Sequence, residues 1–575
     1  MATIETQLPV EVSARTGRSA SAVLLLFSAM WLGALLLFET EIGQFPLRPA
    51  SLLLLAGQAV IAALIYRTDR RGAWSFPFLY FVVLAIFHSG LYVAPALLGR
   101  LAQALQTPAS GWFDEQLGIR AAYIVDLAGG CYAMGYAVSR LTARTRGSSK
   151  PSADPARQAN ERRIREAIAD FGGILTVLGV IAWLTISVTA AGSDFFLRPY
   201  LEYLSATGRA HLPWVFLVLV LGLTLSALDL HRRLSQIAVG AFALYAGLAL
   251  MVGLRDEVFI PLIAAIGVLG CTRPMPRARE FWLAIAGALI AISVISQVRV
   301  HGIAHTTSSE IALSPLSAVE EMGHSIRPLT VSVGWHEGGR RPYLWGATYV
   351  APIDRQARTA LGLPLRDTSD DFRLMNVEVA ARIGAIGGST IAEAHHNGGV
   401  GGVMVVMTLI GGLVGRLFAE RRSAVRIALS GVVAVLLLMH VRNSFAPIPG
   451  WAVMGFGCVL TGVLLGKLRR HFLAPSPYRR SGEVDSRSSD VVTARSSDER
   501  TDRSAVGEPA QRASERSHGL VLARPRTRYA IISPNAAAEP AAAPNRPKRG
   551  MSSSEAAMIA RPPSTPEDPA QLIMP

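Results

Sequence analysis

The stretch SAVLLLFSAMWLGALLLF, residues 21–38, carries no charged side chain and is long enough to cross a lipid bilayer. The hydrocarbon core of a membrane is about 30 Å thick, so a helix that spans it needs roughly 20 predominantly apolar residues. The stretch therefore predicts a membrane-spanning helix. Residues 1–20 before it are polar and lack the pattern of a cleaved signal peptide, so we expect this first span to target the protein.

Eleven more apolar runs follow along the chain, and together they predict an all-α polytopic membrane protein. Charged residues make up only 17% of the sequence, whereas a soluble domain carries about 25%. About twelve transmembrane helices are expected, near residues 21–38, 50–66, 75–97, 121–139, 171–191, 212–230, 234–253, 257–271, 281–297, 399–419, 426–441 and 447–466.

The apolar runs are interrupted by one long loop and end before a polar tail. We expect a cytoplasmic N-terminus over 1–20, transmembrane helices 1–9 within 21–297, a large extracytoplasmic loop over 298–398 and transmembrane helices 10–12 within 399–470. Residues 471–575 are rich in Ser, Arg, Ala and Pro and poor in aromatic residues. Such a composition cannot bury enough apolar surface to fold, so this segment is predicted to be a disordered cytoplasmic tail.

The loops between the runs alternate in charge. Those on one side carry 22 Lys and Arg residues, eight of them in the segment 140–165, whereas the short loops on the other side carry 7. Because basic short loops stay in the cytoplasm, this bias puts both termini there and the long loop outside. Topology thus explains the formal net charge of +15, and no nucleic acid partner is expected.

The long loop carries ionisable residues at helical spacing. In SAVEEMGHSIRPL, Glu320, His324 and Arg327 fall at i, i+4 and i+7 and would share one face of a helix. One interpretation is a cluster for acid–base chemistry and anion binding. The other is a solvated stripe supported by local ion pairs.

The end of the loop reads AEAHHNGG, residues 392–399, just before the tenth predicted span. Glu393 or one of the two histidines, His395 and His396, is placed there to act as a general base. Adjacent histidines point in different directions on a helix, and the three cysteines show no metal-ligand spacing, so no metal site is expected. Asn397 is placed to cap the N-terminus of the tenth span.

Two arginines lie at the outer edge of predicted spans. Arg255 follows the seventh span in GLRDEVF, and Arg442 ends the eleventh in HVRNSF. Charges at such a depth are costly and are usually functional or paired, and the planar fork of arginine matches phosphate oxygens. The alternative for each is a side chain that extends to the membrane surface. Within the spans, His88 and Asp126 are expected to make structural hydrogen bonds between helices.

The order of these features resembles the O-antigen, or oligosaccharide repeat-unit, polymerases of the Wzy type. The resemblance covers roughly residues 250–450 closely and is carried by GLRDEVFIPLI, EEMGHSIRPL, YLWGATYVAPI, GGSTIAEAHHNGGVGGVMVVMTLIGGLVGRL and RNSFAPI. The chain departs from the family at AHHNGG, where the family commonly has an aromatic-rich stretch.

The resemblance implies a metal-independent, inverting membrane glycosyltransferase of the bacterial cytoplasmic membrane, with no cofactor. It would polymerise polyprenyl-pyrophosphate-linked oligosaccharide repeat units, such as those on undecaprenyl pyrophosphate, into a surface polysaccharide on the outer face of the membrane. Arg255, Arg442 and Arg327 would bind the pyrophosphate, and Glu393, His324 or His396 would be the catalytic base. Membrane lipid, a chain-length regulator and a flippase are the expected further partners.

Other functions remain open from the sequence. An O-antigen ligase of similar architecture would use the same arginines with a different acceptor. A metal-dependent glycosyltransferase would use Glu39 and Glu41, although their loop is only about ten residues long. A transporter or flippase of lipid-linked sugars is a further alternative, but the spans lack paired segments broken by Gly or Pro in corresponding halves.

Overall fold

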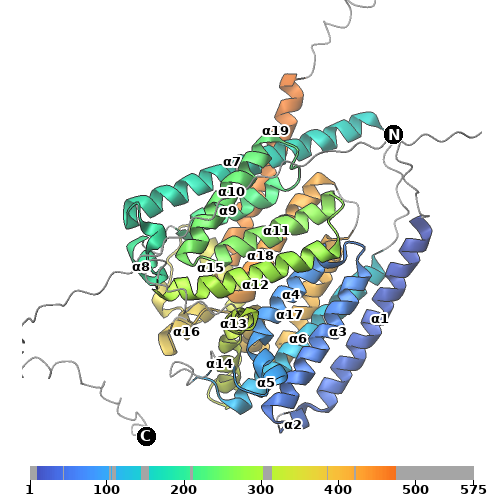
Figure 1. Cartoon of the computed structure of the whole chain (residues 1–575), viewed down its shortest axis with the longest axis vertical. Coiled ribbons are helices and arrows are strands. Elements are labelled where there is room, and N and C mark those ends of the chain that lie inside the picture. The colour runs from blue at the N-terminus through green and yellow to red at the C-terminus, as the bar shows by residue number, and fades with distance from the viewer. Residues whose placement is uncertain are drawn as a thin grey trace, which may run out of the picture. The chain divides into compact units, whose positions relative to one another are not determined.

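The computed structural model describes residues 10–42, 44–102, 105, 112–143, 154–207, 212–301, 314–384, 386–419 and 423–473. Over these residues the chain is helical and contains no strand (Figure 1), which confirms the predicted all-α class. The predicted tail lies outside the described residues from position 474 onward.

The protein is a multi-pass membrane protein. Within the described part of the chain, nine helices are long and apolar enough to cross a membrane. They are α1 (Val10–Leu37), α3 (Leu47–Thr68), α4 (Phe76–Ser89) continued by α5 (Val93–Leu98), α7 (Pro155–Ala191), α10 (Arg233–Val252), α12 (Ala278–His301), α17 (Thr390–Leu417), α18 (Ala424–Arg442) and α19 (Ile448–Leu473).

Each of the three remaining predicted spans also coincides with a helix. These are α6 (Glu115–Thr142), α9 (Leu212–Ser226) and α11 (Asp256–Thr272). The helices α9 and α11 have only 15 and 17 residues, fewer than the roughly 20 that a bilayer requires. The described residues therefore support nine spans by length and composition, or ten if α8 (Tyr200–Thr207) and α9 together form one bent span. The total of twelve stays a prediction.

The helices pack as two groups that meet at the centre. One group is built around α6, which contacts α1, α3 and most extensively α17, and the other around α7, which contacts α9, α10 and α19 (Figure 1). A methyl group on Gly135 or Gly411 would overlap a backbone carbonyl of the facing helix, so only glycine permits the close approach of α6 and α17. Helix α18 joins the groups through contacts with α4, α9 and α11.

Two polar residues inside the spans make different hydrogen bonds. Asp126 of α6 accepts one from Gln58 Nε2 of α3 at 3.4 Å, which confirms the expected link between helices. The expectation for His88 is wrong in its partner, because its Nδ1 lies 2.9 Å from the carbonyl oxygen of Leu84 in the same helix.

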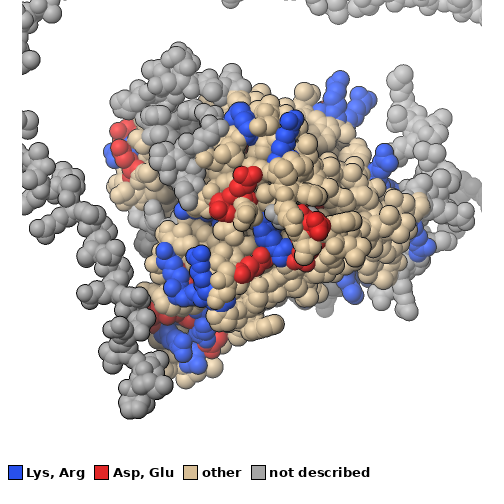
Figure 2. Space-filling model, turned by 90° about the horizontal axis from the view of Figure 1, so that it is seen from below, with Lys and Arg blue, Asp and Glu red and all other residues tan. Residues whose placement is uncertain are grey.

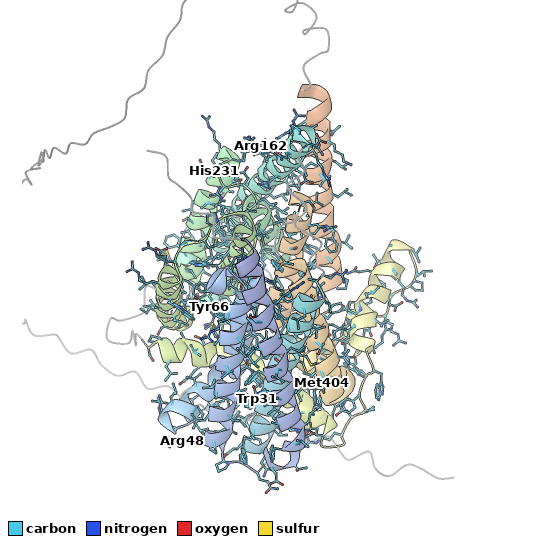
Figure 3. The ribbon with its side chains drawn as sticks, turned by 90° about the vertical axis from the view of Figure 1, so that its right-hand side faces the viewer. Trp31, Arg48, Tyr66, Arg162, His231 and Met404 are labelled. Atoms are coloured by element: carbon cyan, nitrogen blue, oxygen red, sulfur yellow. The ribbon has the colours of Figure 1, made fainter. Side chains whose placement is uncertain are left out.

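The loops gather at two opposite ends of the bundle, as the charge alternation requires. Figure 3 shows Arg162 and His231 at one end and Arg48 at the other. At the first end, Asp170 pairs with Arg232 and Arg469, each at 2.8 Å, which brings three predicted cytoplasmic segments together. Which end faces the cytoplasm stays a prediction from the charge bias.

The predicted long loop is itself helical and folds over the other end of the bundle (Figure 1). It contains α13 (Pro315–Met322), α14 (Arg327–His336), α15 (Ala347–Ala360) and α16 (Met375–Arg382). Figure 2 shows a face of the molecule where acidic and basic side chains are interleaved in a few groups on a mostly uncharged surface.

The helices on either side of the loop extend into it. Helix α12 runs to His301 and α17 begins at Thr390, several residues before the predicted start of the tenth span at 399. Residues 302–313 lie outside the described part of the chain.

Candidate active site

A cavity of about 1190 Å³ lies between α4, α9, α11 and α12, and α15 and the C-terminal end of α18 complete its wall. Most of the lining is apolar, and the four helices contribute apolar side chains such as Val83, Phe216 and Ile263. Its charged lining consists of Arg255, Arg355, Arg442, Asp256 and Glu257. The cavity therefore suits a molecule with a long apolar part and an anionic group.

The charged part of the cavity forms because α11 and α18 lie side by side and run in opposite directions. The N-terminus of α11 then meets the C-terminus of α18. Arg255 precedes the first residue of α11, and Arg442 is the last residue of α18, so the two arginines predicted from the sequence line the same cavity.

Arg255 is the more deeply buried of the two arginines, with only 5% of its side chain exposed. Its Nη1 lies 2.8 Å from Oε1 of Glu321, which is the last residue but one of α13. Even so, neither Nη1 nor Nε of Arg255 makes a hydrogen bond of good geometry among the described residues. A buried guanidinium with unused donors is costly, and a ligand oxyanion would satisfy it.

Arg442 is ion-paired with Asp256 across the junction of α18 and α11. Its backbone carbonyl also accepts a hydrogen bond from Gly388 N at 3.2 Å, so the same residue anchors the end of the loop. Arg255 thus faces Glu321, and Arg442 faces Asp256. An entering phosphate would compete with these two carboxylates for the guanidinium donors.

Arg355 is a third cationic residue of the cavity, and the sequence analysis did not single it out. On α15 it lies on the same face as Pro352 and Thr359, which also line the cavity. Its guanidinium donates to the carbonyl of Arg366 at 2.9 Å and to Thr368 Oγ1 at 2.6 Å. Only the packing of α15 over the cavity distinguishes Arg355 from the other arginines of the loop.

His324 lies two residues after the cavity-lining Met322 and interacts electrostatically with Arg255, but like Arg327 it is not part of the cavity lining. Its Nδ1 is 3.1 Å from the carbonyl oxygen of Glu321, and because a carbonyl only accepts, Nδ1 carries the proton and Nε2 keeps its lone pair. Burial lowers the pKa of His324 below 6.5, and the positive charges of Arg255 and Arg327 act in the same direction. His324 is therefore a neutral base at pH 7.

The expectation that Glu320, His324 and Arg327 share the face of one regular helix is wrong. Helix α13 ends at Met322, and a 3₁₀ turn (Gly323–Ile326) changes the rotation between residues before α14 begins. Glu320 is only 2% exposed, so the solvated-stripe interpretation is also wrong for it. Arg327 lies 5.5 Å above the ring of Trp112 and is not part of the cavity lining.

Comparison with known proteins places the chain in a family. Residues 23–468 match the family model described as O-antigen polysaccharide polymerase Wzy. The chain belongs to the O-antigen polymerase Wzy family. Protein CapE of Staphylococcus aureus is 27% identical over 208 residues, which are 36% of this chain and 45% of CapE, so the chain spans less than half the length of that relative. No solved structure matches.

In this Wzy-family protein, the first turns of α17 are enclosed by the loop helices. Glu393 is 1% exposed, and its Oε2 accepts from Phe445 N at 2.6 Å and lies 3.3 Å from His440 Nε2. Residues 444 and 446 on either side of Phe445 line the cavity, whereas Glu393 does not. The Glu393 carboxylate therefore holds residues 444–446 of the cavity wall in position without itself lining the cavity.

The two histidines of the AEAHHNGG stretch point to different partners, as the sequence analysis expected. His395 Nδ1 lies 2.9 Å from Ser332 Oγ of α14. His396 lies between His336 and Glu378, with its Nδ1 2.8 Å from His336 Nε2 and its Nε2 3.1 Å from Glu378 Oε2. Neither histidine lines the cavity. Among the described residues, no group of three or more His, Cys, Asp or Glu side chains could hold a metal ion.

Helix α17 is broken at Gly398 and Gly399, and Asn397 supports the break. Gly399 has a φ of +59°, which L-residues with a side chain rarely adopt. The carbonyls of His396 and Asn397 accept from the backbone N–H groups of Leu344 and Trp345, so the 343–348 segment satisfies the opened turn. The predicted cap is wrong in position, since Ser389 caps α17 through its 3.0 Å contact with Ala392 N.

Asn397→Ala is expected to destabilise the protein by at least about 3 kcal/mol. Its amide accepts from Gly346 N at 2.9 Å and donates to Thr348 Oγ1 at 2.6 Å and to the Glu393 carbonyl at 2.8 Å. Loss of these buried bonds leaves partners unsatisfied, at about 1–3 kcal/mol each. Denaturant unfolding of the purified protein in detergent checks this, with the exposed Gln236→Ala as control. Equal stability of the two variants would contradict it.

Proposed function

We propose that this protein polymerises polyprenyl-pyrophosphate-linked oligosaccharide repeat units on the outer face of the cytoplasmic membrane. The observation that carries the proposal is the cavity itself, whose apolar walls come from membrane helices and whose charged lining includes Arg255, Arg355 and Arg442. A polyprenyl chain fits the apolar part, and a pyrophosphate fits the arginines. Membership of the Wzy family supports the same reaction class.

The proposed chemistry is an inverting, metal-independent glycosyl transfer. A hydroxyl of the incoming repeat unit attacks the anomeric carbon of the growing glycan, and the bond to the lipid pyrophosphate breaks. The leaving pyrophosphate gains negative charge, and Arg255 and Arg442 stabilise that charge. The buried Nε of Arg255 has no hydrogen-bond partner among the described residues and is available to the phosphate. Arg255 Nη1 would exchange Glu321 for the phosphate, as Arg442 would exchange Asp256. The position of Arg327 over Trp112 makes it a weaker candidate.

His324 is the best supported general base for the acceptor hydroxyl. Its imidazole is neutral, and the hydrogen bond from Nδ1 to the Glu321 carbonyl selects the tautomer in which Nε2 can accept a proton. It also interacts electrostatically with Arg255, which lines the cavity. The other two candidates, Glu393 and His396, are 1% exposed and contact protein groups. We therefore assign His324 the catalytic role and assign Glu393 and His396 positioning roles.

The pH dependence of kcat/KM tests the role of His324. The base must be unprotonated, so the rate is expected to fall as the pH drops through the pKa of His324, which lies below 6.5. His324→Gln should lower kcat/KM by about 100-fold or more and remove this acidic limb. An unchanged acidic limb in a variant that keeps its activity would exclude His324 as the base.

Reconstitution of the purified protein with lipid-linked repeat units tests the overall function. A ladder of glycan lengths on the lipid is the expected product. Transfer of one glycan to a different acceptor would favour a ligase, and movement of lipid-linked sugar across proteoliposomes without glycan growth would favour a transporter. Addition of a chelator is expected to leave the ladder unchanged. The chain-length regulator and flippase stay predictions as partners.

A further inference from the structure

Helix α15 presents an apolar stripe that no described residue covers. Val350, Ile353 and Ala357 of the helix and Leu361, which directly follows its last residue, recur at spacings of three and four and are all exposed, with Leu361 reaching 72%. Such spacing puts them on one side of the helix. Thr348, Pro352, Arg355 and Thr359 project from the opposite side, where they are buried or line the cavity.

Contacts with two membrane helices fix the level of α15 relative to the bilayer. At its start, Trp345 N donates to the carbonyl of Asn397 in α17 at 2.8 Å. Further along, Tyr349 packs edge-on against Phe445 at 5.1 Å between ring centroids, just before α19 begins at Ile448. Both contacts lie where a membrane helix meets the loop, so α15 packs against the loop-side ends of these two helices.

The two membrane helices that α15 contacts also expose apolar side chains. Helix α15 contacts α17 and α19, which expose Val405 and Leu409, and Val453 and Leu460, respectively. In Figure 3 the yellow segment that carries α15 and α16 stands at the right-hand edge of the molecule, beside the orange helices. Exposed apolar side chains of a membrane-spanning helix face lipid, and lipid is the occupant that also suits the exposed stripe of the adjacent α15.

Trp345 gives a second, independent indication of lipid. It is 84% exposed and is the one residue other than glycine with a positive φ in the described part of the chain, at +49°. A strained backbone that turns a large aromatic ring outward needs a compensating contact. Tryptophan is enriched at the membrane–water interface, where its ring is apolar and its N–H remains wet.

We propose that α15 is an interfacial helix that inserts its stripe of Val350, Ile353, Ala357 and Leu361 into the outer leaflet of the membrane, with Trp345 as an anchor at the headgroup level. The opposite side of the helix then faces the cavity with Arg355. Lipid contact thereby holds one wall of the cavity at a fixed depth. This inference depends on the membrane topology and does not require the proposed polymerase activity.

Site-directed spin labelling of the full chain in nanodiscs tests the proposal. The three native cysteines are replaced by serine, and a nitroxide is attached to Ile353→Cys or, in a second variant, to Val350→Cys. Arg340→Cys, an exposed position in the same loop, serves as the matched control. Accessibility to oxygen, which concentrates in lipid, is compared with accessibility to a polar nickel complex.

The labels at positions 350 and 353 are expected to favour oxygen over the nickel complex by several-fold, whereas the label at 340 favours the nickel complex. Equal access of the nickel complex to all three positions would show that α15 lies in water and would overturn the proposal. Protection of 350 and 353 from both reagents, together with dipolar coupling between labels, would show a second copy on the stripe and would also overturn it. If one of the two labelled variants, at position 350 or 353, does not fold, the accessibility measured for the other variant decides between these outcomes.

Discussion

Arg255→Ala is expected to abolish glycan polymerisation while the protein remains folded. The guanidinium lines the cavity and is 5% exposed, its Nη1 is ion-paired with Glu321, and its Nε has no hydrogen-bond partner among the described residues. Removal of one preorganised donor to a developing oxyanion typically costs about 100- to 1000-fold in rate. A reconstituted assay of ladder formation from lipid-linked repeat units measures the loss.

Two further variants separate the charge of Arg255 from its geometry and from general effects on the protein. Arg255→Lys keeps the charge without the planar fork and is expected to retain partial activity. Arg162→Ala removes an arginine whose side chain is 81% exposed at the opposite end of the molecule and should be fully active. Full activity of Arg255→Ala, with unfolding like that of the wild type, would refute the pyrophosphate-binding role.

Glu393→Leu is expected to lose both stability and activity, whereas Glu393→Gln keeps most of both. The carboxylate accepts from Phe445 N at 2.6 Å, and leucine would leave this buried N–H unsatisfied at about 1–3 kcal/mol. The side-chain oxygen of glutamine can still accept this bond. Denaturant unfolding and ladder formation measured on the same preparations distinguish the two variants.

The same pair of variants distinguishes a positioning residue from a base. Glutamine cannot take a proton from the acceptor hydroxyl, so a catalytic Glu393 would make Glu393→Gln inactive although it folds normally. That outcome would move the base from His324 to Glu393. Retained activity would support the role in which Glu393 holds the cavity wall through Phe445.

Hydropathy located a helix at every predicted span, but the long loop ends earlier than the predicted residue 398. Helix α17 begins at Thr390, and its first turns read TIAEAHHN, a sequence too polar to be assigned to a membrane. These polar groups are enclosed by protein and not by lipid, since Ser332, His336 and Glu378 from the loop helices contact the histidines. A hydropathy average records composition and does not detect such partners.

The candidate site was predictable only in part. Arg255 and Arg442 were identifiable because a charge next to an apolar run is conspicuous, and both line the cavity. Arg355 was missed because it is one of several arginines in a polar loop, and only the packing of α15 sets it apart. Nothing in the sequence shows that Arg327 packs over Trp112 outside the cavity lining, and its pyrophosphate-binding role stays a prediction.

The sequence by itself determined the class of protein, the positions of its helices and the grouping of its loops at two ends. These features depend on local properties, namely the length of an apolar run and the charge beside it. The tertiary structure decided which polar groups share one cavity. Arg442 and Asp256 are 186 residues apart in the chain and meet because α11 and α18 pack side by side. That contact depends on the shapes of facing side chains, which no local pattern of hydropathy encodes.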